Sequence, residues 1–461
     1  MNTIMFSAFI LYFFILLSIA FYHSRKIRMA SNSIIGSRST NYWVTAFATQ
    51  SSDMGCWLFL AFPAAVYTEG LFEIWTAIGL VFFMFLNWHC IAPRLRTTSE
   101  QTNSHTLSEL FEKQFSDTTG LINLASSLFI LIFFTFYISA GIVALGLLFK
   151  STFAMSYHSG IVIGICTAML YTLIGTFFTT GWCQLFQGLF LLLMIIAIPA
   201  VAFCNVSGIS AIINAYQSHI FQYSFMHNIP HGLLLAAGWG LGYFGQPHIL
   251  VNFISIDDPK KLNSAKLVGL TGQIIVLSAA IAIGLIALAL FPTPVANPEL
   301  IYILITKSLF NPFIAGVALC AIFSATLSNM NRHILVASSV ITSDSYKKTI
   351  FTQRITSAIV LLFALYVAWT ENSTIYGLVH YAWSGLGSAF GPLVIAALYS
   401  KNITHQGALA GLIIGGTTAA LWPFANTTIS PLIPGFMCNI ITLYGVSWMT
   451  RNPLPSIFFT R

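Results

Sequence analysis

Hydrophobic residues occur in long runs, each the length of a bilayer-spanning helix, along almost the whole chain. A transmembrane helix needs about 20 mostly apolar residues, and the pattern predicts about 13 such spans. We place the spans at residues 4–22, 42–67, 71–92, 121–149, 155–178, 184–205, 232–253, 265–291, 312–340, 355–370, 374–398, 403–424 and 431–450. The longest connections are 93–120, 206–231 and 292–311. We therefore expect an all-α membrane protein with a single transmembrane domain over residues 1–461.

The composition agrees with this class and excludes others. Hydrophobic residues make up 57% of the chain and charged residues 7%, whereas about a quarter of a soluble globular protein is charged. The net charge of +7 does not indicate nucleic-acid binding, because the basic residues are scattered through short loops and form no stripe. The seven cysteines lie almost wholly in apolar stretches without C-x-x-C spacing, so we interpret them as small apolar residues.

The distribution of basic residues predicts the orientation of the spans. Lysine and arginine are enriched in cytoplasmic loops of membrane proteins. If the chain begins outside, 16 of its 19 basic residues fall in cytoplasmic segments, and only Lys150 and Lys307 lie in external loops. We expect an external N-terminus and a cytoplasmic C-terminus. The first basic residues follow the first apolar run instead of preceding it, which indicates an uncleaved span.

Asp53 is the one acidic residue that falls in the middle of a predicted span. A charge at that depth costs at least about 2.5–3.5 kcal/mol and usually faces a bundle interior or an aqueous path. The surrounding sequence, SSDMGCW over residues 51–57, has hydroxyls and a glycine that suit an interrupted helix. Freed carbonyls and hydroxyls favour a small cation. The alternative is a structural carboxylate that caps a broken helix or pairs with a basic residue.

A second interruption is predicted in the span at 232–253. Its sequence GWGLGYFGQPH, residues 238–248, holds four glycines and a proline, which disfavour a regular helix. Trp239 and Tyr243 are spaced i, i+4 and share a face that would wall a pocket. Two interrupted spans suggest two inverted repeats, at about 42–205 and 232–398. The alternative is that the glycines and aromatic residues only pack helix against helix.

The span at 312–340 carries a polar stripe, because Ser324, Ser328 and Arg332 follow one another at i, i+4 and i+8. The stripe predicts a wet face; the alternative is interhelical hydrogen bonding with Arg332 reaching the membrane interface. His248 and His380 lie in spans without metal-ligand spacing, so we expect hydrogen-bonded structural histidines.

Five stretches carry a specific resemblance. They are ATQSSDM at 48–54, GWGLGYFGQPHIL at 238–250, FNPFIAG at 310–316, YAWSGLGSAFGP at 381–392 and GALAGLIIG at 407–415. With these motifs the chain resembles the sodium/solute symporter family, and most closely its bacterial members that carry proline. The resemblance implies a leucine-transporter-type fold of five-plus-five inverted repeats, alternating access and a place in the bacterial inner membrane. It also implies L-proline and Na+ as partners, with sodium as coupling ion and no cofactor.

The resemblance also implies roles for residues. Asp53 corresponds to the family's sodium-linked aspartate, and Arg38 to an arginine important for gating at the cytoplasmic start of the second span. The expected substrate residues are Tyr137, Trp239, Tyr243, Pro247, Gly55, Cys56 and Trp57. The other expected ion ligands are Ser51, Met54, Ala325, Ser328 and Asn329.

The chain departs from the family pattern near these positions. The departures are Gly55 and Cys56 in place of Ser-Gly, Asn329 in place of a hydroxyl residue, Gln184 and Leu304 in place of acidic residues, and Arg332 in place of a neutral residue. These changes remove negative charge and add a cation about one helical turn from the ion site, where a guanidinium would repel sodium or replace its charge. Weakened or lost sodium coupling is therefore one hypothesis.

The sequence predicts sodium-coupled import of proline. The alternatives are another small solute on the same fold, a sodium-independent proline transporter or exchanger with Arg332 in place of the ion, and a solute sensor. An enzyme is not expected, since the chain shows no metal-spaced His/Asp cluster and no Ser-His dyad motif.

Overall fold

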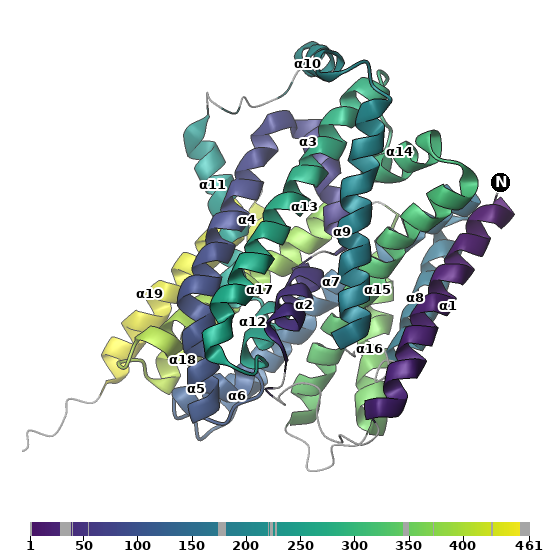
Figure 1. Ribbon diagram of the computed structural model, residues 1–461. Coiled ribbons are helices and arrows are strands. Elements are labelled where there is room, and N and C mark those ends of the chain that lie inside the picture. Colours follow the sequence, from purple (N-terminus) through teal and green to yellow (C-terminus); the bar gives the residue numbers. More distant parts are fainter. Residues whose placement is uncertain are drawn as a thin grey trace, which may run out of the picture.

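The computed structural model describes residues 2–27, 38, 40–53, 55–173, 181–219, 221, 225, 228–343, 350–371, 373–425 and 427–451. Within these ranges the fold is a bundle of helices (Figure 1), with a single isolated bridge between Thr40 and Ile256 as its only strand pairing. The α-helices are α1 (Asn2–Ile27), α2 (Tyr42–Asp53), α3 (Phe62–Glu69), α4 (Ile74–Leu86), α5 (Ala92–Gln101), α6 (Leu107–Gln114), α7 (Leu121–Phe153), α8 (Tyr157–Leu173), α9 (Gly181–Cys204), α10 (Ile209–Ser218), α11 (Ile229–Gly240), α12 (Pro247–Ile254), α13 (Leu262–Leu290), α14 (Ile301–Leu309), α15 (Pro312–Ser343), α16 (Ile350–Ala368), α17 (Ile375–Tyr399), α18 (His405–Leu421) and α19 (Leu432–Thr450).

Every predicted span coincides with one or more of these helices. Among the described residues, eight helical runs are long and apolar enough to cross a bilayer, and three further apolar helices are shorter. The chain is therefore a multi-pass membrane protein, while the count of 13 stays a prediction. The three longest connections contain helices for which no prediction was made: α5 and α6 lie in the first, α10 in the second and α14 in the third. These helices are short, and α10 and the pair α5 and α6 lie at opposite ends of the bundle (Figure 1).

The predicted interruption of the second span is confirmed. Helix α2 ends at Asp53, and a π-helical turn at Trp57–Ala61 leads into α3. Between them the backbone turns at Gly55, whose amide donates to the Asp53 carbonyl over 2.9 Å. The polar side chains of the second half of α2 are buried around this break.

The seventh predicted span is also interrupted, as its glycines suggested. Helix α11 ends at Gly240, a 3-10 turn covers Leu241–Gly245, and α12 begins at Pro247. The turn packs closely on α17: a Cβ atom added to Gly245 would lie 2.6 Å from the Gly391 backbone nitrogen and 2.7 Å from the Leu386 carbonyl oxygen. The missing side chain therefore lets the broken helix approach its neighbour.

The innermost spans are those that touch both interruptions. In α15 and α17, 83% of the most apolar stretch of the helix is buried inside the protein, against 33% in α18 and α19. The inner spans pack against α7, of whose most apolar stretch 72% is buried. The two broken helices are thus held by the core of the bundle and not by its lipid-facing rim.

We expect Gly245→Ala to destabilise the protein, because the new methyl group would collide with backbone atoms of α17 that cannot turn aside. Overpacking of this kind costs about 1–3 kcal/mol. Gly445→Ala in α19 is the matched control, since a Cβ atom there meets no atom within 4 Å. Thermal unfolding in detergent measures both, and equal midpoints for the two variants would contradict the packing argument.

Candidate functional site

Asp53 joins the two interrupted spans. Its carboxylate is 2% exposed, and its Oδ2 atom accepts a hydrogen bond of 2.6 Å from the Tyr243 hydroxyl, which lies in the turn between α11 and α12. The other carboxylate oxygen, Oδ1, is buried and has no hydrogen-bond partner among the described residues. None of the ion pairs seen in the described ranges includes Asp53. One carboxylate oxygen therefore remains available to a cation or a donor.

A chain of side-chain hydrogen bonds continues from this pair into α13. The Gln273 amide donates to the Tyr243 hydroxyl over 3.3 Å, and the Gln50 amide donates to the Gln273 carbonyl oxygen over 2.6 Å. Gln50 and Asp53 belong to the same half-helix, so the chain closes on α2. Amides inside spans gave no distinct sequence signal, and these two glutamines were missed for that reason.

Aromatic rings meet at the same junction. Trp57 and Trp239 stack with ring centroids 5.6 Å apart and planes 18° apart, so each interruption contributes one ring. The indole of Trp57 donates to the Asp53 carbonyl over 2.9 Å, and the indole of Trp383 in α17 donates to the Trp239 carbonyl over 2.7 Å. These bonds fix an apolar wall beside the carboxylate. Trp383 was not singled out in the sequence because a tryptophan in an apolar span is ordinary.

The expected ion ligands Ala325, Ser328 and Asn329 are all buried on α15. The Asn329 amide donates to the Ser52 carbonyl over 3.0 Å, and the Asn329 carbonyl oxygen is buried with no hydrogen-bond partner in the described part of the chain. Helix α15 therefore meets the first interruption with both a donor and a buried oxygen.

Arg332 also points at α2. Its guanidinium donates to the Ala48 carbonyl over 2.7 Å and to the Ser51 hydroxyl over 3.0 Å. The arginine forms interhelical bonds at the side chain of an expected ion ligand, and its contact atoms turn inward and not toward the interface. Ser324, from the same predicted stripe, accepts a 2.5 Å bond from Tyr12 of α1. The stripe therefore serves two different helix contacts.

Tyr137 of α7 lies in a cluster with two buried histidines. Its ring centroid is 4.3 Å from that of His333 and 5.8 Å from that of His248. The Tyr137 hydroxyl and both ring nitrogens of His248 are buried without hydrogen-bond partners among the described residues. The expected hydrogen bond of His248 is thus not seen, whereas His380 has one, at 3.0 Å from the Ser430 hydroxyl.

The remaining expected substrate residues adjoin the interruptions. Pro247 opens α12 and is buried, which suits proline at a helix start. Cys56 is buried, with its sulfur 3.8 Å from the Ala140 carbonyl of α7. A Cβ atom on Gly55 would lie 2.6 Å from the Asn329 amide nitrogen, so this glycine lets α15 reach the break.

Arg38 lies away from this site, at the start of α2. Its guanidinium donates to the Ser99 carbonyl of α5 over 2.7 Å. Beside it, the Thr40 amide donates to the Ser255 carbonyl over 3.2 Å, and the Asp257 amide donates to the Thr40 carbonyl over 3.0 Å. Arg96 of α5 adds a bond of 2.9 Å to the Ile256 carbonyl. These contacts clamp the start of α2 to the segment that follows α12, at the ends of the two broken helices opposite to the interruptions.

Three further positions named in the sequence analysis contribute little to the description of the site. Met54 and the side chain of Gln184 lie outside the described residues. Leu304 is a partly buried residue of the short helix α14.

Two interrupted helices facing each other over a buried carboxylate form the architecture of secondary transporters, whose sites lie where half-helices meet. The model of the "Sodium:solute symporter family" matches residues 34–415. The High-affinity proline transporter PutP of Bacillus subtilis is 35% identical over 96% of this chain and 97% of its own length. The Sodium/proline symporter of Haemophilus influenzae is 34% identical over 96% and 93%. The chain belongs to the sodium:solute symporter family, and it is a transporter and not an enzyme.

Solved structures show the same fold. A Na+-coupled sialic acid symporter in a substrate-bound outward-open state superposes with a TM-score of 0.80 at 18% identity, over 97% of this chain and 98% of its own. MhsT in complex with L-phenylalanine gives 0.59 at 14% identity, over 89% and 99%. The leucine-transporter-type fold implied by the sequence is confirmed.

We expect the Tyr243–Asp53 bond to contribute measurably to stability. A hydrogen bond to a charged group contributes about 1.5–3 kcal/mol, and a buried charge that loses its donor is penalised further. Tyr243→Phe should therefore lower the midpoint of thermal unfolding in the wild-type background and much less in an Asp53→Leu background. Equal shifts in both backgrounds would show that the two side chains are not coupled.

Proposed function

We propose that this protein imports proline together with sodium. The relatives that it matches over most of their length are named sodium/proline symporters or proline transporters. The observation that carries the proposal is the buried Asp53 carboxylate, which bonds to Tyr243 of the second interruption through one oxygen and has the other free of protein donors in the described ranges.

Sodium supplies what this carboxylate lacks. A buried charge without an ion-pair partner is unfavourable, and a cation beside Oδ1 of Asp53 would neutralise it. The backbone turn at Gly55 and the buried oxygens of Ser328 and Asn329 lie on the elements that meet here. Oxygen ligands from carboxylate, hydroxyl, amide and carbonyl groups suit a hard cation.

Proline would bind between the two interruptions. Trp57 and Trp239 offer an apolar wall for the pyrrolidine ring, while helix ends and backbone amides at the breaks suit its carboxylate. Cys56 and Tyr137 would complete the pocket from the first break and from α7. Because Tyr243 bonds to Asp53, an ion bound at Asp53 and a substrate in contact with Tyr243 would act on the same hydrogen-bonded pair of side chains.

Alternating access then requires the clamp at the ends of the broken helices to open. The backbone bonds between Thr40 and the 255–257 segment, with Arg38 and Arg96 bonded beside them, hold that end closed. By the excess of basic residues in its loops, this end would face the cytoplasm, with the N-terminus outside. The membrane would be the bacterial inner membrane, as the bacterial relatives suggest. The repeats about 42–205 and 232–398 would move against each other.

Uptake of labelled proline into proteoliposomes tests the proposal. We expect accumulation driven by an inward sodium gradient and abolished by Asp53→Asn, which keeps the shape of the side chain and removes the charge. If proline enters neither with nor without the sodium gradient, the protein carries another solute. Accumulation by the variant equal to that of the wild type would remove Asp53 from the ion site.

The bonds of Arg332 favour a second candidate, in which proline is carried without sodium. The guanidinium already places a positive charge against Ala48 and Ser51 of α2, close to the interruption, and its geometry is that of a fixed cation bound to oxygens. In this candidate Arg332 supplies the charge that sodium supplies elsewhere in the family.

Replacing the arginine separates the two candidates. If Arg332 stands in for sodium, wild-type uptake ignores the sodium gradient, and Arg332→Cys makes it sodium-dependent because the charge beside α2 is gone. Arg332→Lys, which keeps the charge, is the matched control and should behave like the wild type. Identical sodium dependence of the wild type and Arg332→Cys would rule out this candidate.

A further inference from the structure

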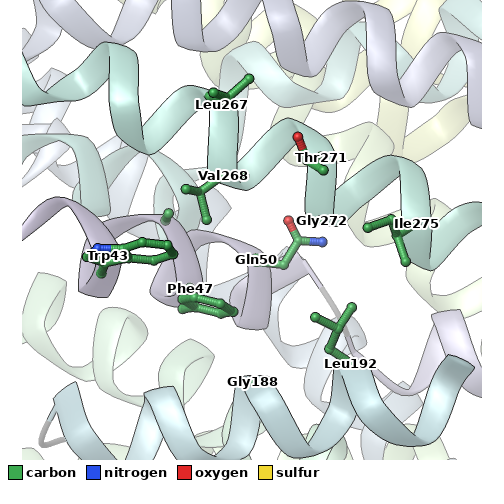
Figure 2. Close-up of a pocket in the computed structure, with 12 residues that line it drawn as sticks. Trp43, Phe47, Gln50, Gly188, Leu192, Leu267, Val268, Thr271, Gly272 and Ile275 are labelled. Carbon is green, nitrogen blue, oxygen red and sulfur yellow. The ribbon is translucent and has the colours of Figure 1, made fainter. Parts of the chain in front are cut away.

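A cavity of about 300 Å³ lies between α2, α9 and α13 (Figure 2), and its lining includes neither Asp53 nor the aromatic residues that meet at the two breaks. Trp43, Phe47 and Gln50 of α2 line one side at helical spacing, with the rings of Trp43 and Phe47 stacked 17° apart. Opposite them the helices are hollowed at Gly188 of α9 and Gly272 of α13. The lining is almost entirely apolar.

The mouth of the cavity is continuous with the lipid-facing surface of the bundle. Leu267 and Trp43, at its rim, are 68% and 46% exposed, and Ile275 is 40% exposed. All three belong to predicted membrane spans. Apolar side chains exposed on spans face acyl chains, and tryptophan prefers the level of the lipid headgroups. The opening therefore faces the bilayer, with Trp43 nearest the interface.

We propose that an acyl chain of a bilayer lipid inserts into this cavity, which we call the α2–α9–α13 cavity. Water would find few polar partners there, since a buried water needs two to four. An empty apolar void forfeits dispersion contacts on all its walls. The volume, many times the ~10–15 Å³ that one water needs, has room for a stretch of methylene groups, and its apolar lining excludes a headgroup. Retention depends on shape, because lipid tails are as apolar as the walls.

The inserted acyl chain would affect the transport site. Gln50, which is 5% exposed, lines the cavity next to Gly272 (Figure 2) and is bonded through Gln273 and Tyr243 to Asp53. An acyl chain packed against α2 contacts the same half-helix that carries the Asp53 carboxylate. Occupancy of the cavity should therefore change the rate at which α2 moves during transport, and this consequence rests on the proposed function.

Photo-crosslinking tests occupancy without any transport assay. Phosphatidylglycerol with a diazirine in one acyl chain is reconstituted with the full chain, illuminated, and the labelled peptides are identified by mass spectrometry. We expect label concentrated on the cavity segments of α2, α9 and α13 above that on other lipid-facing faces, such as α7 around Leu124, which is 62% exposed. Label no denser there than on α7 overturns the proposal.

Two variants close the cavity in different ways. A Cβ atom on Gly272 would lie 3.6 Å from the Gln50 side chain, in ordinary contact, so Gly272→Phe fills the interior. Thr271→Trp, at an exposed position of the rim, covers the mouth without entering the core and serves if the first variant does not fold. Each should lose most of the label on the cavity segments, while Leu124→Phe, the control, keeps it. Undiminished label in a folded Thr271→Trp variant contradicts insertion.

Uptake measured in the same vesicles distinguishes the two proposals. Retained cavity label without proline uptake would refute the proposed function and leave the lipid site standing. Proline uptake with uniform label would do the reverse. If both proposals hold, Thr271→Trp should change the initial uptake rate while Leu124→Phe does not. Equal uptake rates for the two variants would show that the cavity does not affect transport.

Discussion

The hydrogen bond between the Tyr243 hydroxyl and the Asp53 carboxylate is the contact on which the rest of the site depends. It joins two half-helices that are about 190 residues apart in the chain and holds a charge where no ion pair with a described residue offsets it. The stacked indoles of Trp57 and Trp239 meet at the same point. A ligand that binds here therefore acts on both interruptions at once, which is what coupled transport needs.

Glycine makes this contact possible. The turn that presents Tyr243 reaches Asp53 only because Gly245 lets it lie against the backbone of α17, and the break at Gly55 lets Asn329 of α15 approach α2. Irregular backbone inside a membrane is tolerated where protein or a cavity covers its polar groups. The burial of α7, α15 and α17 provides that cover. The packed core is therefore what allows the two helices to be interrupted.

The sequence predicted the parts of this arrangement that break a local rule. Asp53 was found because one acidic residue in the middle of a span is costly, and the second interruption because glycines and a proline in one span cannot form a regular helix. What the sequence could not provide were tertiary partners. Gln50 and Gln273 look like ordinary polar residues until the fold brings them together. Likewise, helical spacing predicted that Arg332 lies on one stripe with Ser324 and Ser328. It could not show whether the guanidinium bonds to α2 or reaches the membrane interface.

The short helices α6, α10 and α14 escaped prediction because they are too short for an apolar span. Their existence changes the ends of the bundle and not the site.

The proposed function depends on Asp53 as a ligand of the coupling ion. Equilibrium dialysis with labelled sodium, in saturating proline, tests it most directly on the wild type and Asp53→Asn. We expect bound sodium in the wild type and none in the variant, whereas equal binding in both would show that Asp53 is not a ligand of the ion.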